Sequence, residues 1–370
     1  MFVRIGIMTL SASDNCGSLL QSYALKTILE NLGNNVEIIN FTTEQSHSMY
    51  DIIPKYVWKH PRTLFYHLKS YGKLKSSAAD YTNFRKKNLG LNGSELYPKD
   101  LKDIKDNYDI IVAGSDQVWN VNMADYDDAF FCGWTDCKKV AYAPSLGGHD
   151  IQESADYNKI QKWVNSFSSI SVRENKGKLS LERATDKNVE LVLDPTLVLE
   201  PSEWEKLVEK RLVDEKYIFY YSWAYCEDSL KDIVKKEAER RGCKVYVVDP
   251  KKWIRKSEKN WGFNLCKKNG PLAFLNLMYY SELNFVESFH GMIFSYIFKK
   301  DFWLLDTNEK YENMNTRLIE ISDVLQVQDR VISPYNFTKV DMDKKIDFDN
   351  NTNLQKMREK SMNYIKQSIM

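Results

Sequence analysis

The sequence predicts an α/β protein with two Rossmann-like domains that face one cleft. Three observations support this fold class. The chain has 370 residues, enough for two or three domains with separate cores. Strand-like apolar runs alternate with helical patterns in both halves, which is typical of parallel sheets. Between the halves, residues 194–202 contain two prolines and no periodicity, which indicates a domain boundary.

The N-terminal half begins with a βαβ unit. Residues 2–8 form a near-continuous apolar run, typical of a buried parallel strand, and residues 9–17 are polar, as in a loop. From Ser18 the apolar residues have helical spacing until Gly33, which ends the helix. Further strands are expected at residues 36–41, 109–113, 140–144 and 168–172.

The C-terminal half repeats this rhythm. Strands are expected at residues 217–221, 244–248, 283–286 and 302–305, and helices at residues 228–241, 271–280, 291–299 and 353–370. We therefore expect a Rossmann-like domain over residues 1–198 with a helical insertion near 50–88, a second Rossmann-like domain over 199–345, and a terminal helix within 346–370 that packs back on the first domain.

Composition narrows the class of protein. The 52 Lys and Arg nearly balance the 51 Asp and Glu, which argues against a general nucleic-acid binder. The six cysteines (Cys16, Cys132, Cys137, Cys226, Cys243 and Cys266) form no metal-binding knuckle and are expected to be free thiols. No apolar run reaches 18 residues, and the apolar start has the character of a strand, so a cytoplasmic protein without metal is expected.

One segment departs from the α/β rhythm. Residues 52–79 contain six Lys and Arg, several aromatic residues and no acidic residue. A solvated helical insertion would explain this pattern. A contact with an anionic membrane surface would explain it too, and would place the protein at the inner face of the membrane.

The loop after the first strand is the first candidate site. In doubly wound sheets, ligands bind outside the carboxyl ends of the strands, where helix N-termini present N–H groups to anions. Asn15, Gly17 and Ser18 lie there, and Gln21 follows one turn later. A plain helix cap formed by Asn15 or Ser18 is the alternative.

Two further loops follow later strands of the first half. Ser115, Asp116 and Gln117 come after residues 109–113 and offer hydrogen-bond acceptors and donors, although turn chemistry alone would explain them. Ser145 lies in the next polar loop, whose His149 is expected to be a surface residue.

Two further candidate sites contain residues that could bind a charged ligand. Arg173 ends a strand and could bind phosphate or carboxylate, or form a salt bridge with a neighbouring acid. In the second half, Glu287, Ser288, His290 and Gly291 open a helix after a strand. Histidine suits acid–base work near neutral pH, but it could also satisfy backbone groups at the helix start.

Taken together, these places resemble the polysaccharide pyruvyl transferase family. The matching motifs, in order, are NCGSLLQSYAL at residues 15–25, AGSDQVWN at 113–120, AYAPSLG at 141–147, SVRE at 171–174, LDPTL at 193–197 and ESFHGMIFSYIF at 287–298. Many relatives have an aromatic residue where Cys16 stands, and Arg at the position of Ser288. The second departure leaves one anionic contact to be supplied from elsewhere.

The resemblance implies a glycosyltransferase-B-like arrangement and a transfer of pyruvate from phosphoenolpyruvate to two hydroxyls of a sugar. The product would be a cyclic ketal on a surface polysaccharide or its lipid-linked precursor. No cofactor is implied besides phosphoenolpyruvate as co-substrate. The first domain would hold the acceptor, and the second the donor.

Roles for individual residues follow from the resemblance. His290 would act as general acid/base or as the cation opposite the phosphate, and Asp116 as base or sugar-hydroxyl acceptor. Arg173, Ser288, Gly291, Asn15, Gly17 and Ser18 would bind the donor anion, and Gln21, Ser115, Gln117, Trp119 and Ser145 the acceptor. Trp119, Trp134, Tyr142 and Trp223 could stack on the sugar, or belong to the core.

The sequence is also compatible with two other functions. A nucleotide-sugar glycosyltransferase would share the fold class and could use Glu287 to hold the ribose hydroxyls. A non-catalytic glycan-binding protein is the other possibility. That function would not explain why an arginine and a histidine lie at strand ends.

Overall fold

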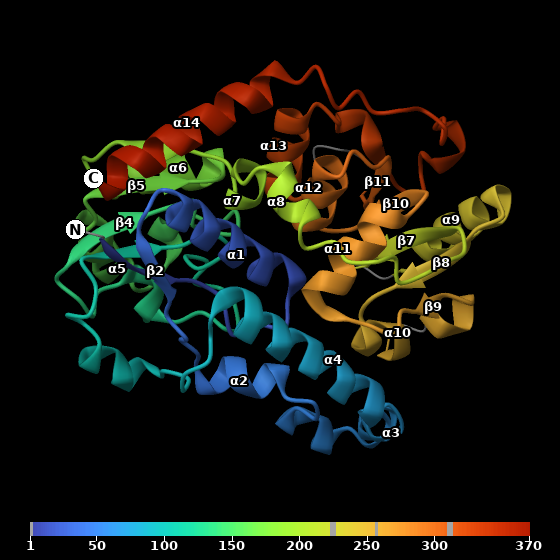
Figure 1. The fold of residues 1–370 in the computed structure, drawn as a ribbon, viewed down its shortest axis with the longest axis horizontal. Helices are drawn as coiled ribbons and strands as arrows, with labels where there is room; N and C mark the ends of the chain where they lie inside the picture. Colours follow the sequence, from blue (N-terminus) through green and yellow to red (C-terminus); the bar gives the residue numbers. More distant parts are fainter. Residues whose placement is uncertain (1–2, 223–226, 256–257, 309–313) are drawn as a thin grey trace. The chain divides into compact units, whose positions relative to one another are not determined.

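The chain folds into two units, each built on its own sheet. The computed structural model describes residues 3–222, 227–255, 258–308 and 314–370 (Figure 1). Unit 1 comprises Met1–Asp51, Arg85–Leu199 and Gln355–Met370, and unit 2 comprises Ile52–Phe84 and Glu200–Leu354.

Unit 1 contains a six-stranded parallel sheet in the order β2-β1-β3-β4-β5-β6. The order reverses between β1 and β3, so the carboxyl ends of these two strands lie side by side at the topological switch point, where doubly wound sheets bind ligands. The strands are β1 (Arg4–Met8), β2 (Asn35–Ile38), β3 (Ile110–Ala113), β4 (Lys138–Ala141), β5 (Ser169–Val172) and β6 (Val189–Leu191).

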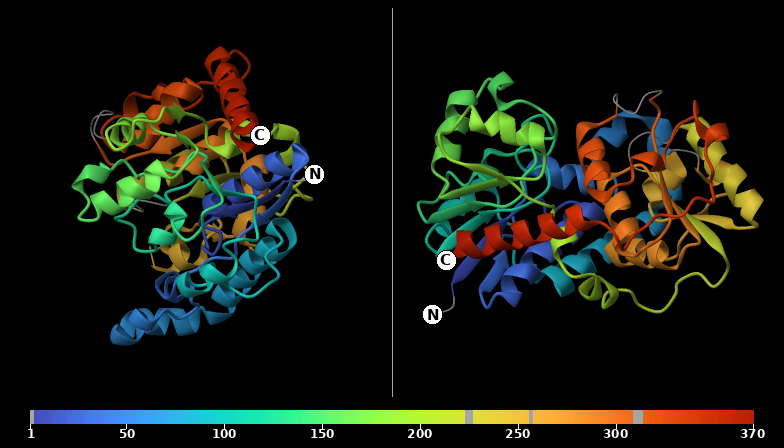
Figure 2. Two further views of the ribbon diagram at one scale, coloured as in Figure 1. Left: turned by 90° about the vertical axis from the view of Figure 1, so that its left-hand side faces the viewer. Right: turned by 90° about the horizontal axis from the view of Figure 1, so that it is seen from above.

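Helices cover both faces of the unit 1 sheet. In Figure 2, α5 and α6 lie on one face, and α1 and α14 lie on the other. The terminal helix α14 is tied to the sheet, because Ser361 accepts a hydrogen bond from the Leu193 N–H at 2.9 Å and the Tyr364 hydroxyl donates to the Ala141 carbonyl at 2.9 Å. The helices are α1 (Cys16–Asn31), α2 (Glu44–Tyr50), α5 (Tyr157–Asn165), α6 (Asn175–Glu182), α7 (Pro195–Val198) and α14 (Thr352–Ile369).

Unit 2 contains a second six-stranded parallel sheet, in the order β12-β11-β10-β7-β8-β9, with its own switch point between β7 and β10. The strands are β7 (Tyr217–Tyr221), β8 (Lys244–Val247), β9 (Asn264–Leu265), β10 (Leu283–Val286), β11 (Phe302–Leu305) and β12 (Val331–Ile332). The helices are α3 (Pro61–Lys69), α4 (Tyr71–Phe84), α8 (Pro201–Glu205), α9 (Asp228–Arg241), α10 (Pro250–Arg255), α11 (Gly270–Tyr280), α12 (Phe289–Ile297) and α13 (Thr316–Leu325).

The helical insertion belongs to unit 2, whereas the sequence analysis assigned it to the first domain. On α4, Asp80 accepts a hydrogen bond at 2.9 Å from the N–H of Asn269, the residue before α11. The Lys73 ammonium lies 5.6 Å from the ring centroid of Trp253 on α10. Asn269 is 189 residues from Asp80 along the chain, so no local pattern could reveal where the insertion packs.

The predicted fold class, an α/β chain with two Rossmann-like halves, is confirmed. The expected cleft between the halves stays a prediction. Strands β6, β9 and β12 were not predicted; they have three, two and two residues, too few to show a pattern. Within the described ranges, no helix has the length and apolar character needed to cross a membrane.

Candidate active site

The first turn of α1 is capped by a side chain from the loop after β1. The side-chain Oδ1 of Asn15 accepts hydrogen bonds from the N–H groups of Gly17 at 2.9 Å and Ser18 at 3.4 Å. This is the cap weighed as the alternative in the sequence analysis. Two of the N–H groups expected to bind an anion are therefore occupied by Asn15, so donor binding by Asn15, Gly17 and Ser18 stays a prediction.

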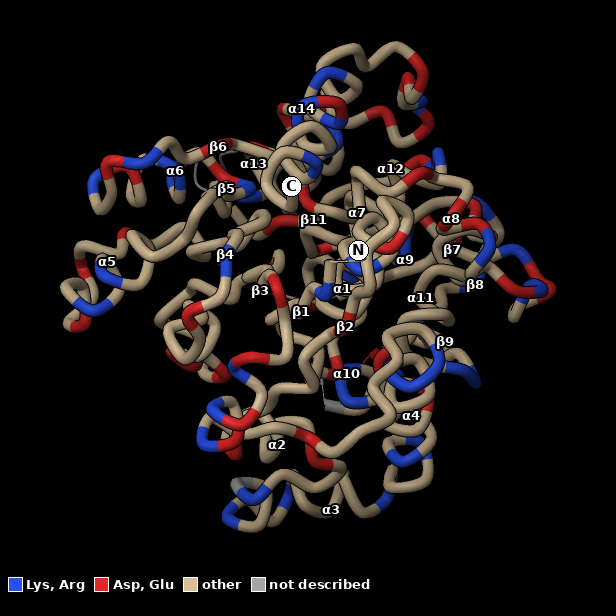
Figure 3. The backbone as a smooth tube through the Cα atoms, turned by 60° about the vertical axis from the view of Figure 1, so that its left-hand side comes forward, with Lys and Arg blue, Asp and Glu red and all other residues tan. Residues whose placement is uncertain are grey.

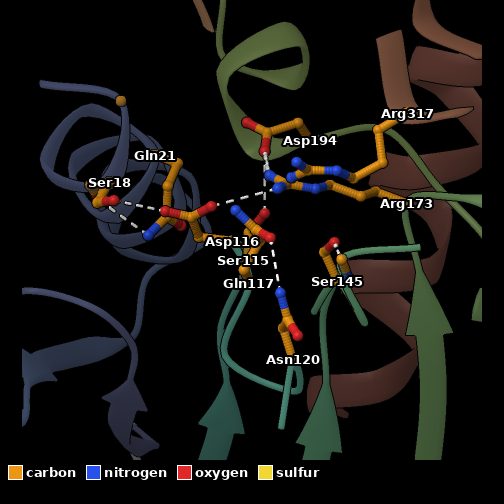
Figure 4. Close-up of polar contacts among 12 residues, drawn as sticks. Ser18, Gln21, Ser115, Asp116, Gln117, Asn120, Ser145, Arg173, Asp194 and Arg317 are labelled. Atoms are coloured by element: carbon orange, nitrogen blue, oxygen red, sulfur yellow. Dashed lines mark hydrogen bonds and ion pairs between the residues drawn. The ribbon is translucent and has the colours of Figure 1, made fainter. Parts of the chain in front are cut away.

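Asp116 lies at the switch point of unit 1, in the loop after β3. Its φ angle of 74° places it in the left-handed region, which non-glycine residues rarely adopt. Its carbonyl accepts a hydrogen bond from the Ser145 N–H at 2.7 Å, which fixes the turn against the next loop. One carboxylate oxygen accepts a hydrogen bond from the Ser18 hydroxyl at 2.5 Å, so the α1 start and this loop meet at Asp116 (Figure 4).

Arg173 forms the centre of a buried charge cluster. Its guanidinium contacts Asp194 at 2.5 Å, Asp116 at 3.2 Å and Glu174 at 3.8 Å, and the Arg173 side chain is only 2% exposed. Figure 4 shows Arg173 directed toward Asp116 and Asp194, which come from different loops at the same edge of the sheet. The ion pair weighed for Arg173 from the sequence is therefore present.

The charges of this cluster suit a neutral, hydroxyl-bearing ligand better than an anion. Burial acts to lower the pKa of Arg173, but Asp194, Asp116 and Glu174 outweigh it and raise that pKa, so Arg173 stays charged. Three carboxylates thus surround Arg173, and a phosphate beside it would be repelled by those acids. Binding of the donor anion by Arg173 stays a prediction, and the three acids around Arg173 disfavour it.

Hydroxyl groups hold the acids of the Arg173 cluster in place. The Ser115 hydroxyl donates to Asp194 at 3.0 Å, and the Ser145 hydroxyl donates to Glu174 at 2.6 Å. Both serine side chains are fully buried. Ser115 and Ser145 thus lie at the cluster, where their hydroxyls position carboxylates. Neither has exposed surface with which to contact an acceptor sugar.

Gln21 and Gln117, two further predicted acceptor residues, lie around the same loops. The buried Gln21 amide donates to the Thr9 hydroxyl at 2.8 Å and to the Ser18 carbonyl at 2.9 Å, so it braces the loop after β1. Gln117 is partly exposed, and its side-chain oxygen accepts a hydrogen bond from Asn120 at 3.0 Å. Of the two, only Gln117 has an accessible surface.

The aromatic residues proposed for sugar stacking belong mainly to the core. Trp119 is 1% exposed, stacks on Phe131 with 5.0 Å between ring centroids, and donates through its indole N–H to the Phe130 carbonyl. Tyr142 is also 1% exposed, whereas Trp134 is partly exposed and lies against the core. Trp119 therefore presents no face to a sugar. Trp223 lies outside the described residues.

Asp194 and Glu174 belong to the cluster, although neither was expected at the site from the sequence. Both lie in quoted motifs, but Asp194 was used only to mark a domain boundary. Its other carboxylate oxygen caps α7 by accepting hydrogen bonds from the Thr196 N–H at 3.0 Å and hydroxyl at 2.6 Å. An Asp directly before Pro, with Thr two residues later, is the signal of a helix N-terminus that could have placed it at a strand end.

A second group of unassigned residues adjoins Asp116. Arg85 donates to the carbonyls of Ser11 at 3.1 Å and Ala12 at 2.9 Å and pairs with Asp14, which anchors the loop after β1. Burial, followed by the charges of Asp125, Asp14 and Asp116, raises the pKa of Tyr50. The phenol therefore keeps its proton at neutral pH.

The predicted donor residues of unit 2 open α12, after β10. Ser288 caps the helix, since its hydroxyl accepts a hydrogen bond from the Gly291 N–H at 3.0 Å. A Cβ atom at Gly291 would lie 2.9 Å from both this hydroxyl and Val286, so only glycine fits. His290 lies in the first turn of α12 and is half-buried, at the carboxyl edge of the sheet. Its role as donor-side acid or base stays a prediction.

Two buried carboxylates accompany the carboxyl ends of β7 and β10. Glu287 accepts a hydrogen bond from the Tyr220 hydroxyl at 2.5 Å, and Glu258 accepts one from Ser222. Burial raises the pKa of Glu258 to about 7, and Glu287 acts in the same direction, whereas Ser222 and Lys252 oppose the shift. Glu258 was not singled out from the sequence, because no motif surrounds it.

The raised pKa of Glu258 makes stability depend on pH. Because its folded-state pKa of about 7 exceeds that of an unfolded glutamate, its contribution is complete in acid and is lost as the pH rises through about 7. We expect Glu258→Gln to have little effect on the free energy of unfolding at pH 5 and to raise it by on the order of 3 kcal/mol at pH 8. Urea unfolding of both proteins at these pH values tests this, and an equal difference at both would contradict it.

Similarity to solved structures defines the class of fold. UDP-GlcNAc 2-epimerase of Methanocaldococcus jannaschii, solved with UDP-GlcNAc and UDP, superposes with a TM-score of 0.57 at 14% identity, over 99% of this chain and 100% of the epimerase chain. UDP-GlcNAc 2-epimerase of Neisseria meningitidis, bound to UDP-GlcNAc, gives a TM-score of 0.51 at 10% identity, over 99% and 100%. The fold is therefore the glycosyltransferase-B-like one, built from two Rossmann-like halves.

The family follows from the sequence. The model of the polysaccharide pyruvyl transferase family matches residues 15–309, which include α1 and the loops after β3, β4, β5 and β10. The chain belongs to this family of transferases. A search of curated proteins found no match to the chain.

Proposed function

We propose that this protein transfers the pyruvyl group of phosphoenolpyruvate to two hydroxyls of one sugar and closes a cyclic ketal on a surface polysaccharide or its lipid-linked precursor. The observation that carries the proposal is the family match over residues 15–309. The chemistry of the two sheets' carboxyl edges supports the proposal. The edge of unit 1 carries hydrogen-bond acceptors, which suit a sugar, and the edge of unit 2 carries a helix N-terminus and a histidine, which suit an anion.

Unit 1 would hold the sugar. Asp116 is a hydrogen-bond acceptor, which suits a sugar hydroxyl, and the protonated phenol of Tyr50 is a donor. Asp116 would take the proton of the attacking hydroxyl as general base. Gln117 has the exposure needed for an acceptor contact. Ser18, Ser115 and Ser145 would act by positioning the acids.

Unit 2 would hold phosphoenolpyruvate. The first N–H groups of α12 and the positive end of its dipole favour an anion, and His290 lies in that turn. The Gly291 N–H is already bound by Ser288, so these two residues would shape the turn. His290 would protonate the methylene carbon or oppose the charge of the departing phosphate.

The reaction balances with these groups alone. The first hydroxyl adds to C2 of phosphoenolpyruvate as its proton passes to Asp116, and the methylene carbon C3 gains a proton to become a methyl group. The second hydroxyl then attacks C2, the bond between C2 and the phosphate oxygen breaks, and inorganic phosphate leaves with the second proton. Phosphoenolpyruvate is the only co-substrate, and the balance calls for no resident cofactor.

Arg173 takes a different role in this proposal from the one expected from the sequence. Its contacts with three acids make it a positioning residue that orients Asp116. The anionic contact that Ser288 cannot provide would then come from the N-terminus of α12 and from His290.

The direct test measures phosphate release from phosphoenolpyruvate with a panel of free and lipid-linked oligosaccharides, and the mass of the product. Wild type should release phosphate only with an acceptor and add one pyruvyl ketal. Asp116→Asn should lower turnover by about a hundredfold or more, since asparagine keeps the shape of the side chain and one acceptor oxygen but cannot take up a proton. Asp150→Asn alters a carboxylate that pairs with the exposed Arg183 and accepts hydrogen bonds from the Gln152 N–H and the Ser180 hydroxyl, and this change should leave turnover unchanged.

A nucleotide-sugar enzyme of the same fold is the competing function. It is distinguished by thermal stabilisation, because a ligand that binds only the folded state raises the melting temperature. Stabilisation by phosphoenolpyruvate supports the proposal. Stabilisation by UDP, without any effect of phosphoenolpyruvate, would replace it with the competing function.

A further inference from the structure

The helix α3 and its flanks expose a mixed apolar and cationic surface, which we call the basic aromatic face. Trp58 is 64% exposed, Phe65 61% and Leu68 55%. The face is made of the exposed side chains of Trp58, Phe65, Tyr66, Leu68 and Tyr71 together with those of Lys55, Lys59, Arg62 and Lys69.

The apolar side chains are concentrated here far beyond the scatter usual on a protein surface. Ten large hydrophobic side chains are exposed among the described residues, and five of them fall within residues 58–71. Single exposed hydrophobic residues are ordinary, but a contiguous group marks an interaction surface. The grouping therefore needs a partner.

The positive charge of residues 52–79 favours an anionic partner. Residues 52–79 contain six Lys and Arg and no acid, which leaves 46 Lys and Arg against 51 Asp and Glu elsewhere in the chain. Lys55, Lys59, Arg62 and Lys69 form no ion pair with any acidic side chain of the described ranges. Figure 3 shows Lys and Arg recurring along α3 and its flanks.

The segment is held firmly by its opposite side, so the face is presented to solvent by the fold. Val57 is fully buried, and Leu74 is 4% exposed. His67 is 3% exposed, and its Nδ1 lies 3.1 Å from the Ile52 carbonyl oxygen. Three side chains of the segment are thus buried, and one of them, His67, lies on α3 between the exposed Tyr66 and Leu68.

We propose that the basic aromatic face docks on the surface of a membrane containing anionic phospholipid. Trp and Tyr favour the interface of a bilayer, and Phe and Leu can enter the acyl boundary. Lys and Arg beside them attract anionic headgroups while their stems lie along apolar surface. An acidic protein or polymer would explain the cations but not the exposed Phe65 and Leu68. The proposal does not depend on the proposed function, because binding is measured without substrate.

Flotation of the full-length protein with vesicles tests the docking surface. Vesicles of phosphatidylcholine mixed with phosphatidylglycerol should bind the wild type at least about tenfold more tightly than phosphatidylcholine alone, and salt should weaken the binding. K59E/R62E/K69E should lose about a hundredfold in binding. The matched control K86E/K99E/K102E reverses three exposed lysines outside the face and should change binding less than about threefold.

The apolar part of the face is tested separately. W58S/F65S keeps every charge and should weaken vesicle binding by about tenfold, with an unchanged melting temperature because both side chains are exposed. Unchanged binding in K59E/R62E/K69E, or an equal loss in the control, would overturn the proposal. So would unaltered binding of W58S/F65S together with tight binding to dextran sulfate, which would assign the face to an anionic polymer. Self-association abolished by W58S/F65S, without vesicle binding, would assign it to a second copy of the chain.

Discussion

Replacing Arg173 by methionine should lower the free energy of unfolding by about 3–5 kcal/mol. The substitution removes a buried cation that contacts Asp116, Glu174 and Asp194 and leaves these three buried carboxylates without that partner. Desolvated like charges repel strongly, and their protonation or exposure costs stability. Urea unfolding monitored by circular dichroism gives the change directly.

Two further variants separate this effect from a general loss of packing. Arg183→Met removes an exposed arginine paired with Asp150 and should cost less than about 1 kcal/mol. Adding Asp194→Asn to Arg173→Met removes one of the stranded charges and should restore part of the lost stability. A loss below about 1 kcal/mol in Arg173→Met would show that solvent reaches the cluster and that the acids do not need the arginine.

Replacing His290 by glutamine should lower phosphate release from phosphoenolpyruvate by about 10²–10⁴-fold. Glutamine keeps a hydrogen-bonding side chain in the first turn of α12 but cannot carry a positive charge or exchange a proton near neutral pH. The proposed steps at C3 and at the leaving phosphate both require one of these properties. Initial rates of acceptor-dependent phosphate release measure the effect.

The control for His290 is the exposed His149, whose change to glutamine should leave the rate unaltered. Ser288→Ala removes the cap of α12 and should cost about 1 kcal/mol of stability. Wild-type rates in His290→Gln would remove His290 from the mechanism. They would not affect the family assignment, which rests on the whole matched sequence.

The candidate site could be located from the sequence but not assembled from it. Small and polar residues after apolar strands correctly indicated that Asp116 and Arg173 follow strand ends and that Ser18 lies at the start of the helix after the first strand. Arg173 and Asp194 are 21 residues apart and Ser18 and Asp116 are 98 apart, yet each pair shares a hydrogen bond. Which acid faces the arginine depends on strand order, which local patterns do not contain.

The aromatic residues show the same limit. Trp119 follows a strand end and is adjacent in sequence to Asn120, so its position alone suited a ligand contact. In the structure its ring stacks on Phe131 and is 1% exposed. Whether an aromatic side chain turns toward the core or a ligand depends on neighbours from other elements, and a single sequence does not record them.

By itself, the sequence determined the α/β class, the bounds of β7, β10, β11 and α9, the acid-free segment and the family. These features depend on local apolar periodicity, on composition and on ordered motifs, all of which are properties of neighbouring residues. Only the tertiary structure decided that Arg173 is enclosed by three acids and that residues 52–84 pack in unit 2. Both features depend on contacts between segments that are distant in the sequence. Packing and charge pairing in the folded chain determine which segments meet.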